Sequence, residues 1–163
     1  MQCIYVRHGK TEYSLKNLFA GRKDIPIIGI DEALINEAIS LVKSSKPEIL
    51  LHSPLLRAVQ TSEFFSKEFS FKKVISEPLL IERDFGCYEG LEKTKLNRES
   101  LEFEESVEKI ENLEARAISF IEKYKGQNIL VVGHSAFYRS LIKFSGSTEK
   151  RKLNCCESVQ ILI

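Results

Sequence analysis

Two histidines occupy positions where they could do chemistry. One follows the strand-like run in "CIYVRHGKTE", which ends at Arg7-His8-Gly9, and the other follows "NILVVG" in the stretch Gly133-His134-Ser135. In open α/β sheets, ligands gather at the carboxyl ends of the strands. We therefore predict that the two imidazoles meet at one edge of a sheet.

A second arginine is expected at the same edge. In "LHSPLLRAVQTS" a strand ends at His52, a helix begins near Pro54, and Arg57 lies one turn inside that helix. A helix N-terminus offers free backbone N–H groups and a partial positive charge, so Arg57 beside it would add to an anion site. Gly9 would let the backbone approach a ligand without a Cβ in the way. A nucleophilic imidazole among cations can attack a phosphoryl group and hold it covalently.

Hydrophobic patterning predicts the elements that position these residues. Strand-like runs recur at residues 2–6, 48–52, 72–76, 128–133 and 158–163, and three of the four intervals show helical periodicity. One helix is expected around 33–42 and another over about 104–124, with its acidic residues on the outer face and Gly126 at its C-cap. The nearly continuous apolar run at 128–133 is typical of a strand covered on both faces. These patterns predict an α/β fold with helices on both sides of a mostly parallel sheet.

Length and charge narrow the class of protein. The chain has 163 residues, which fits one domain spanning 1–163. It carries 24 Lys and Arg residues against 23 Asp and Glu, a net charge of +1, with no basic block to follow a nucleic acid backbone. The apolar start is too short for a signal peptide, and no window approaches the roughly 18 apolar residues of a membrane span. We expect a soluble cytoplasmic protein without nucleic acid or membrane partners; the sequence carries no signal of its oligomeric state.

The cysteines do not have the spacing of a metal or redox site. Cys155 and Cys156 are adjacent, and neither Cys3 nor Cys87 has a neighbour two residues away. We therefore expect no metal and no cofactor. Cys3 lies within a predicted strand and Cys155 and Cys156 open another, so these three are interpreted as small buried hydrophobes, and Cys87 is left unassigned.

Taken together, these residues resemble the histidine phosphatase superfamily, which includes cofactor-dependent phosphoglycerate mutase. The match runs nearly end to end and keeps the order of the family. It comprises Arg7-His8-Gly9 followed by Thr11, then "FAGRKDIPIIGIDEA", "SPLLRAVQT", "ERDFGCYEG" and "VVGHSAFYRSL". The resemblance implies a three-layer α/β/α sandwich of the phosphoglycerate mutase-like type.

The resemblance also implies roles for single residues. His8 would be the nucleophile and transient phosphohistidine, while Arg7, Arg57 and His134 would bind the phosphoryl oxygens. Glu82 would be the general acid, and the apolar "PLLI" before it provides the buried setting that such an acid needs. Further phosphate or substrate contacts would come from Gly9, Thr11, Ser14, Gly21, Arg83 and the backbone N–H of Ser135.

Several positions depart from the mutase pattern. Mutases carry more positive residues in an insertion after the loop with the acid, but here the corresponding segment, "LEKTKLNRESLEFE", is short and has no adjacent arginine pair. Lys93, Lys95 and Arg98 are its candidate substrate contacts. Ser14, Ala20 and Phe85 stand where mutases have asparagine, threonine and tyrosine. We therefore expect a phosphatase with cations at one end of its substrate only.

The predicted function is a metal-independent phosphomonoesterase that works through phosphohistidine 8. A small phosphometabolite of the sugar phosphate or α-ribazole phosphate type is the favoured substrate. A phosphohistidine protein phosphatase and a phosphoglycerate mutase are alternatives within the same family. A non-catalytic phospho-ligand binder on the same fold is a further alternative, although such a chain would be expected to lose His8, Glu82 or His134.

A serine esterase is the rival from another class. "GHSAF" imitates the G-x-S-x-G nucleophile elbow, but Phe137 stands where the elbow has glycine and no histidine follows Ser135. A Ser-His-Asp esterase is therefore excluded. Of the remaining polar residues nearby, we expect His52 at the rim of the site or packed, Asp84 and Glu89 in structural roles, and Arg83 in either a salt bridge or a substrate contact.

Overall fold

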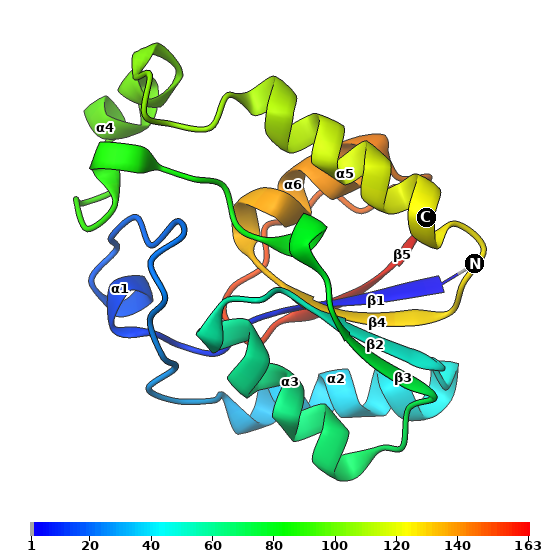
Figure 1. The fold of residues 1–163 in the computed structure, drawn as a ribbon. Coiled ribbons are helices and arrows are strands. Elements are labelled where there is room, and N and C mark those ends of the chain that lie inside the picture. The colour runs from blue at the N-terminus through cyan, green and yellow to red at the C-terminus, as the bar shows by residue number, and fades with distance from the viewer. Residues whose placement is uncertain (1) are drawn as a thin grey trace.

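The computed structural model describes residues 2–163, and this part of the chain forms a five-stranded sheet with helices on both faces (Figure 1). The strand order is β3-β2-β4-β1-β5, and β5 alone runs antiparallel to its neighbour. The strands are β1 (Gln2–Arg7), β2 (Ile49–His52), β3 (Lys73–Ser76), β4 (Ile129–Gly133) and β5 (Ser158–Leu162). The predicted three-layer α/β/α fold with a mostly parallel sheet is confirmed.

Two pairs of long helices cover the sheet, one pair on each face (Figure 1). The pairs are α2 (Glu32–Ser45) with α3 (Leu56–Glu68), and α5 (Ile110–Tyr124) with α6 (Ser135–Phe144). The shorter elements are α1 (Glu12–Leu15), α4 (Lys95–Ser100) and single 3₁₀ turns at Pro78–Leu80, Gly86–Tyr88 and Leu101–Phe103.

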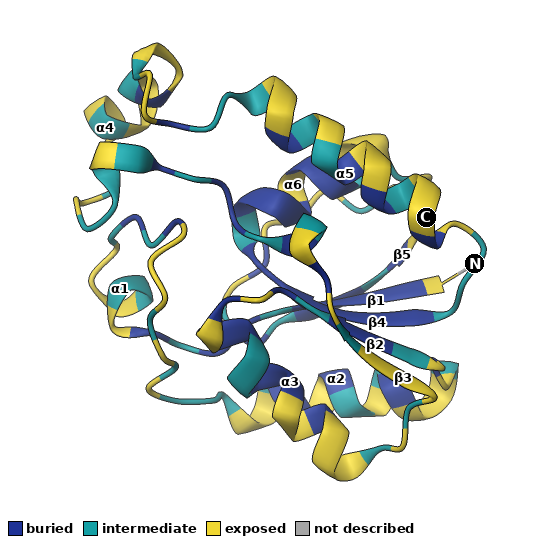
Figure 2. Ribbon diagram, in the orientation of Figure 1, coloured by how far each residue is buried: buried dark blue, intermediate teal, exposed yellow. Residues whose placement is uncertain are grey.

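Successive side chains of a strand point to opposite faces of the sheet, and this alternation divides the hydrophobic core into two halves. In β1, Cys3 and Tyr5 pack with α5 and α6, whereas Ile4 and Val6 pack with α2 and α3. Both sets are fully buried, and Figure 2 shows the central strands buried while the outer sides of the helices are exposed. This two-sided cover is the reason why the central strands read as continuous apolar runs.

The carboxyl ends of β1, β4 and β2 lie side by side. Arg7 is paired with Gly133 and His52 with Val132, so the three strands finish at nearly the same level. The residues that follow these strands therefore leave the sheet at one edge, which is where ligands bind in open α/β sheets.

Two details of the predicted elements are wrong. The helix expected from about Glu104 begins at Ile110, because Val107 is buried in the preceding loop and Glu108 pairs with Arg116 at 2.9 Å instead of facing solvent. Cys155 and Cys156 form a turn before β5 and do not open the strand.

The cysteines differ in exposure. Cys3 and Cys156 are buried as expected, Cys155 is half-buried and Cys87 is exposed. Among residues 2–163, no helix has both the length and the apolar composition needed to cross a membrane.

Candidate active site

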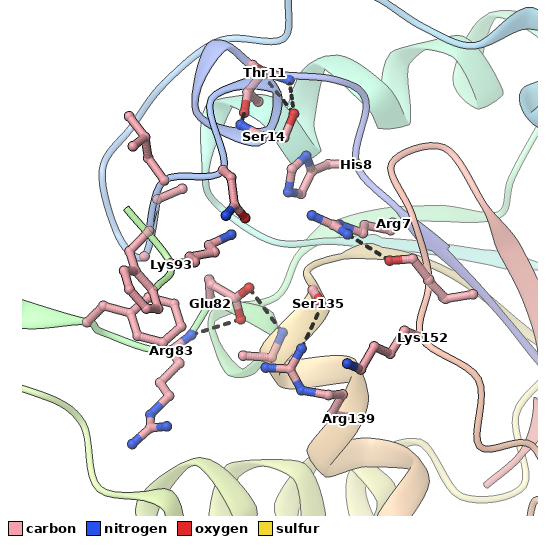
Figure 3. Close-up of a pocket in the computed structure, with 18 of the residues that line it drawn as sticks. Arg7, His8, Thr11, Ser14, Glu82, Arg83, Lys93, Ser135, Arg139 and Lys152 are labelled. Atoms are coloured by element: carbon pink, nitrogen blue, oxygen red, sulfur yellow. Dashed lines mark hydrogen bonds between the residues drawn. The ribbon is translucent and has the colours of Figure 1, made fainter. Parts of the chain in front are cut away.

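A cavity of about 470 Å³ opens at the carboxyl end of β1 (Figure 3). It is lined by most of the residues singled out from the sequence, together with several that were not. The predicted site residues in its wall are Arg7, His8, Thr11, Ser14, Gly21, Arg57, Glu82, Arg83 and Ser135. The structure therefore brings together side chains from segments far apart in the sequence, as the resemblance implied.

His8 is held in one tautomer by its own main chain. Its Nδ1 lies 2.8 Å from the carbonyl oxygen of Gly9. Because a carbonyl oxygen can only accept, the proton of the neutral ring is on Nδ1, and Nε2 keeps a lone pair. His8 is 5% exposed and lines the cavity, so a neutral imidazole with an unprotonated Nε2 belongs to the cavity wall.

The surroundings of His8 also keep its ring neutral. Burial lowers the pKa of His8 well below its usual range, and the guanidinium groups of Arg57 and Arg7 lower it further. A cationic ring would have no lone pair with which to attack. The same charges that would receive a phosphate thus preserve the nucleophilic form of the ring.

His134 lies next to His8 and is fully buried. The two ring centroids are 5.2 Å apart, and His134 Nε2 is 2.7 Å from the hydroxyl of Ser53. Burial, followed by the charge of Arg57, lowers the pKa of His134 well below its usual range. Its Nδ1 has no hydrogen-bond partner among residues 2–163. His134 thus has one buried ring nitrogen whose hydrogen-bonding capacity is unused, and the residue does not form part of the cavity wall.

Arg7 and Arg57 line the part of the cavity next to His8, here called its inner end, and both donate hydrogen bonds to uncharged carbonyl oxygens. Arg7 donates to the carbonyl of Leu153 at 2.7 Å, and Arg57, which is fully buried, donates to the carbonyls of Gly21 and Lys23, each at 2.7 Å. Within the described chain, the Nε atoms of Arg7 and Arg57 have no hydrogen-bond partner. Carbonyl oxygens position a guanidinium without cancelling its charge, so both cations remain able to bind an anion.

Glu82 caps the start of α6. Its carboxylate accepts hydrogen bonds from the backbone N–H groups of Ala136 and Phe137, each at 3.1 Å, and of Arg83 at 3.0 Å. It is only 7% exposed, and Figure 3 shows it facing the cavity across from His8. These donors fix the carboxylate in place, and they are tertiary contacts that the apolar "PLLI" before Glu82 does not reveal.

Thr11 and Ser14 form a capping box at the start of α1. Thr11 Oγ1 accepts from the N–H of Ser14 at 3.1 Å, and Ser14 Oγ accepts from the N–H of Thr11 at 2.9 Å. Both residues line the cavity, but both hydroxyls are already engaged with the main chain. Their observed task is to shape the loop after His8.

The structure gives a reason for glycine at both Gly9 and Gly21, two of the predicted substrate contacts. A Cβ on Gly9 would lie 2.8 Å from Ile30 Cδ1 and 3.0 Å from the carbonyl oxygen of Gly29, so packing against this loop requires a glycine at position 9. Gly21 has φ of +50°, and a Cβ there would meet Glu89. Its contribution is the carbonyl that holds Arg57.

Arg83 lines the cavity, but its guanidinium is engaged by other parts of the chain. Its guanidinium donates to Glu102 at 2.7 Å and to the carbonyl of Glu108 at 2.9 Å, and in Figure 3 it points away from the centre of the cavity. Its charge is therefore used in a salt bridge, which was the other interpretation.

The structural expectations for the neighbouring polar residues agree with the contacts. Asp84 accepts from Gly86 N–H, and Glu89 accepts from the N–H groups of Arg22 and Phe85. His52 contacts the carbonyl of Ser53 through Nδ1 and lies outside the cavity wall.

The rim of the cavity carries more positive charge than expected. Lys93 and Arg98, two of the three candidates from the short segment, line the cavity, whereas Lys95 is exposed outside it. Arg139 and Lys152 line it as well and were missed. The cavity wall thus holds more cations than the short segment supplies, and the additional two come from α6 and from the connection to β5.

Sequence signals for the missed residues differ in strength. Arg139 stands four residues after Ser135, so a helix starting there places both on one face, and the spacing could have identified it. Ser53, the partner of His134, and Tyr5, whose hydroxyl bonds to the main chain of His134, depend on tertiary contacts. Lys152 lies in an irregular connection with no local signal.

Comparisons with known proteins agree with the geometry. The model of the histidine phosphatase superfamily (branch 1) matches residues 3–154. A Bacillus subtilis (strain 168) protein named "Uncharacterized phosphatase PhoE" is 30% identical over 94% of this chain and 84% of its own length. A 2,3-bisphosphoglycerate-dependent phosphoglycerate mutase of Cytophaga hutchinsonii is 27% identical over 85% of this chain and 74% of its own.

A solved structure shows the same fold. The crystal structure of phosphoglycerate mutase from Thermus thermophilus superposes with a TM-score of 0.74 at 24% identity, covering 100% of this chain and 97% of that one. The family resemblance noted from the residues is thus confirmed by the match over nearly the whole sequence. The chain belongs to the histidine phosphatase superfamily.

Proposed function

We propose that this protein is a metal-independent phosphomonoesterase that transfers a phosphoryl group from a small phosphorylated metabolite to His8 and then to water. The observation that carries the proposal is the fixed tautomer of His8, whose Nδ1 bonds to Gly9 and whose Nε2 is left with a lone pair. His8 lines a cavity that has Arg7 and Arg57 in its wall as well. A neutral imidazole beside two unpaired guanidinium groups suits phosphoryl transfer.

In the first step, His8 Nε2 forms a bond to phosphorus while the ester P–O bond breaks. The negative charge in the transition state spreads over the remaining phosphoryl oxygens, where Arg7 and Arg57 stabilise it. His134 adds a donor through Nδ1 if Ser53 supplies its hydroxyl proton to Nε2. Ser53 Oγ already accepts from the N–H of Leu55 at 3.3 Å, which leaves its own proton for His134.

Glu82 is the proposed acid for the leaving group and the base for the water. Its carboxyl group is held by the backbone N–H groups of Ala136 and Phe137 and lines the cavity, and in this proposal it enters the first step carrying a proton. That proton goes to the leaving oxygen as the alcohol departs. In the second step Glu82 takes a proton from water, the oxygen of the water bonds to phosphorus, the P–N bond breaks, and inorganic phosphate leaves with His8 restored.

A small metabolite, of the sugar phosphate or α-ribazole phosphate type, is the proposed substrate. A cavity of about 470 Å³ suits a molecule of that size. The rim cations favour a second candidate, a phosphoglycerate mutase, because a mutase must hold both ends of its intermediate while it reorients. A coupled assay with 3-phosphoglycerate and catalytic 2,3-bisphosphoglycerate separates the two: a phosphatase accumulates free phosphate, and a mutase forms 2-phosphoglycerate with little phosphate released.

The phosphohistidine step has a direct test. Protein quenched in alkali during turnover of labelled substrate should retain label on His8, and the label should be lost in acid, as expected of a phosphoramidate. Activity should persist in EDTA. Label on another residue, or turnover that a chelator abolishes and added metal restores, would contradict the proposal.

A further inference from the structure

The charge of the cavity is strongly unbalanced. Its wall contains one carboxylate, that of Glu82, against the cationic side chains of Arg7, Arg57, Arg83, Lys93, Arg98, Arg139 and Lys152. The chain as a whole has a net charge of only +1. The excess of positive charge is therefore a property of this cavity and not of the protein surface in general.

The cations of the cavity fall into groups with different partners. Arg83 is neutralised by Glu102, and Arg7 and Arg57 form the proposed phosphoryl site. Within residues 2–163, the rim cations have no carboxylate partner within 4.0 Å, while neighbouring cations outside the cavity do have one, such as Lys95 with Glu99 and Lys143 with Glu114. The rim cations are Lys93, Arg98, Arg139 and Lys152.

These unpaired cations repel one another. The pKa of Lys93 falls to about 8, first because the amine is partly buried and then because Arg7, Arg98 and Arg139 are close. Arg139 is exposed as a residue, but the surrounding chain partly shields its guanidinium from water; this lowers the pKa of Arg139, and the charge of Arg98 adds to the effect. An anion at the rim would relieve this repulsion, since each cation is already held near the others without a counter-charge.

Two of the rim cations are positioned beside the proposed phosphoryl site. Arg139 donates to Ser135 Oγ at 3.0 Å, which directs its guanidinium along the first turn of α6 toward the cavity. Lys152 precedes Leu153, a buried residue whose carbonyl holds Arg7 at 2.7 Å. In Figure 3, Arg139 and Lys152 lie together on the far side of Ser135 from His8.

From this arrangement we propose that Arg139 and Lys152 bind a second anionic group, a carboxylate or a second phosphate, on the leaving alcohol of the substrate. The inference rests on the proposed phosphatase function and narrows its substrate class. A phosphomonoester with a neutral remainder brings two negative charges, which Arg7 and Arg57 already balance. Since the guanidinium of Arg139 bonds to Ser135 Oγ and both residues line the cavity, the second anion would lie on the α6 side of the phosphoryl group.

Matched substrate pairs test this subsite. Glycerol 3-phosphate and 3-phosphoglycerate share a carbon skeleton and differ by one carboxylate; fructose 6-phosphate and fructose 1,6-bisphosphate differ by one phosphate. We expect the wild-type protein to prefer the anionic member of at least one pair by about tenfold or more in kcat/KM, as for a charge-assisted hydrogen bond. The pair that shows the preference identifies the second anion as carboxylate or phosphate.

The variant Arg139→Gln/Lys152→Gln should remove most of that preference. Its loss on the anionic substrate should exceed its loss on the neutral one by about tenfold. The matched control is Lys143→Gln/Lys150→Gln, which removes the same charge from α6 and from the same connection but outside the cavity wall, and it should keep the preference. No preference in the wild-type protein, or an equal preference in both double variants, would overturn the inference.

A binding measurement separates this inference from the proposed function. The affinities of both members of each pair are measured by calorimetry on His8→Ala protein with and without the Arg139 and Lys152 changes. Tighter binding of the anionic member that depends on Arg139 and Lys152 supports the subsite even if no phosphomonoester is hydrolysed. Equal binding overturns the subsite, and hydrolysis of p-nitrophenyl phosphate by the wild-type protein then leaves the phosphatase proposal standing.

Discussion

At the inner end of the cavity, the fully buried Arg57 and the half-buried Arg7 donate to backbone carbonyls, whereas at the rim Arg139 and Lys152 are exposed. Both regions carry positive charge, but only the first is fixed by the fold. Groups that stabilise a transition state must be held in place before the substrate arrives. Long exposed side chains can instead adjust to the remainder of a substrate.

This difference assigns the two regions different tasks. The inner end suits the phosphoryl group, which every phosphomonoester presents in the same way, and the rim suits the group that differs between substrates. Changes at the inner end should therefore reduce turnover of all substrates alike, while changes at the rim should depend on the substrate chosen.

The largest effect is expected from His8→Ala. Without the nucleophile, turnover of both alkyl and aryl phosphates should fall by about 10⁴-fold or more, since groups that act as a unit fail together. Release of inorganic phosphate measures this loss. His52→Ala is the matched control, because His52 lies outside the cavity wall and should leave the rate nearly unchanged. A His8→Ala protein with a substantial fraction of wild-type activity would show that another residue carries the phosphoryl group.

Arg57→Met should have the next largest effect. The change removes a fixed cation from the phosphoryl site and leaves the carbonyls of Gly21 and Lys23 without their donor. We expect kcat/KM to fall by about 10²- to 10³-fold, by the same factor for glycerol 3-phosphate and for 3-phosphoglycerate. A loss confined to one of the two substrates would show that Arg57 determines substrate selectivity. It would contradict the proposed division of tasks between the inner end and the rim.

Glu82→Gln tests the proton transfer. The leaving oxygen of an alkyl ester is strongly basic and needs a proton, whereas p-nitrophenolate does not. The variant should therefore lose roughly a hundredfold in kcat on an alkyl phosphate and much less on p-nitrophenyl phosphate. Equal losses on the two substrates would identify Glu82 as a cap of α6 only, a role that its bonds to Ala136 and Phe137 already provide.

The inner end was predictable from the sequence because its residues have local signals. His8 and His134 each follow an apolar strand, and Arg57 follows a strand that leads into a helix. Parallel strands bring such positions to one edge, so strand ends are enough to predict that they meet. The fold class was predictable for the same reason, since continuous apolar runs indicate a sheet covered on both sides.

The remainder of the site depends on contacts between distant segments. Lys152 is brought to the rim because the carbonyl of Leu153 bonds to Arg7, an interaction across 146 positions of sequence. The guanidinium of Arg83 is paired with Glu102, and Val107 ends the predicted extension of α5 by packing into the core. In each case a tertiary contact decides a position that local pattern leaves open.

The smallest predicted effect concerns Lys93 and pH. Burial, with Arg7 and Arg98 nearby, lowers the pKa of its ammonium to about 8. The charged form predominates below that pH and the neutral amine above it, so attraction of the rim for an anion weakens as pH rises through about 8. Because kcat/KM reports groups of the free enzyme, its value for 3-phosphoglycerate should fall by up to about tenfold between pH 7 and 9.

Lys93→Arg is the control that assigns this pH dependence to one side chain. A guanidinium stays charged throughout the range, so the variant should keep a nearly constant kcat/KM for 3-phosphoglycerate between pH 7 and 9. The substrate phosphate is already a dianion at pH 7, since its second proton is lost near pH 6. Its own titration therefore adds no change in kcat/KM between pH 7 and 9. If the arginine variant shows the same decline as the wild-type protein, the titrating group lies elsewhere. The rim then owes its selectivity to Arg98, Arg139 and Lys152 alone.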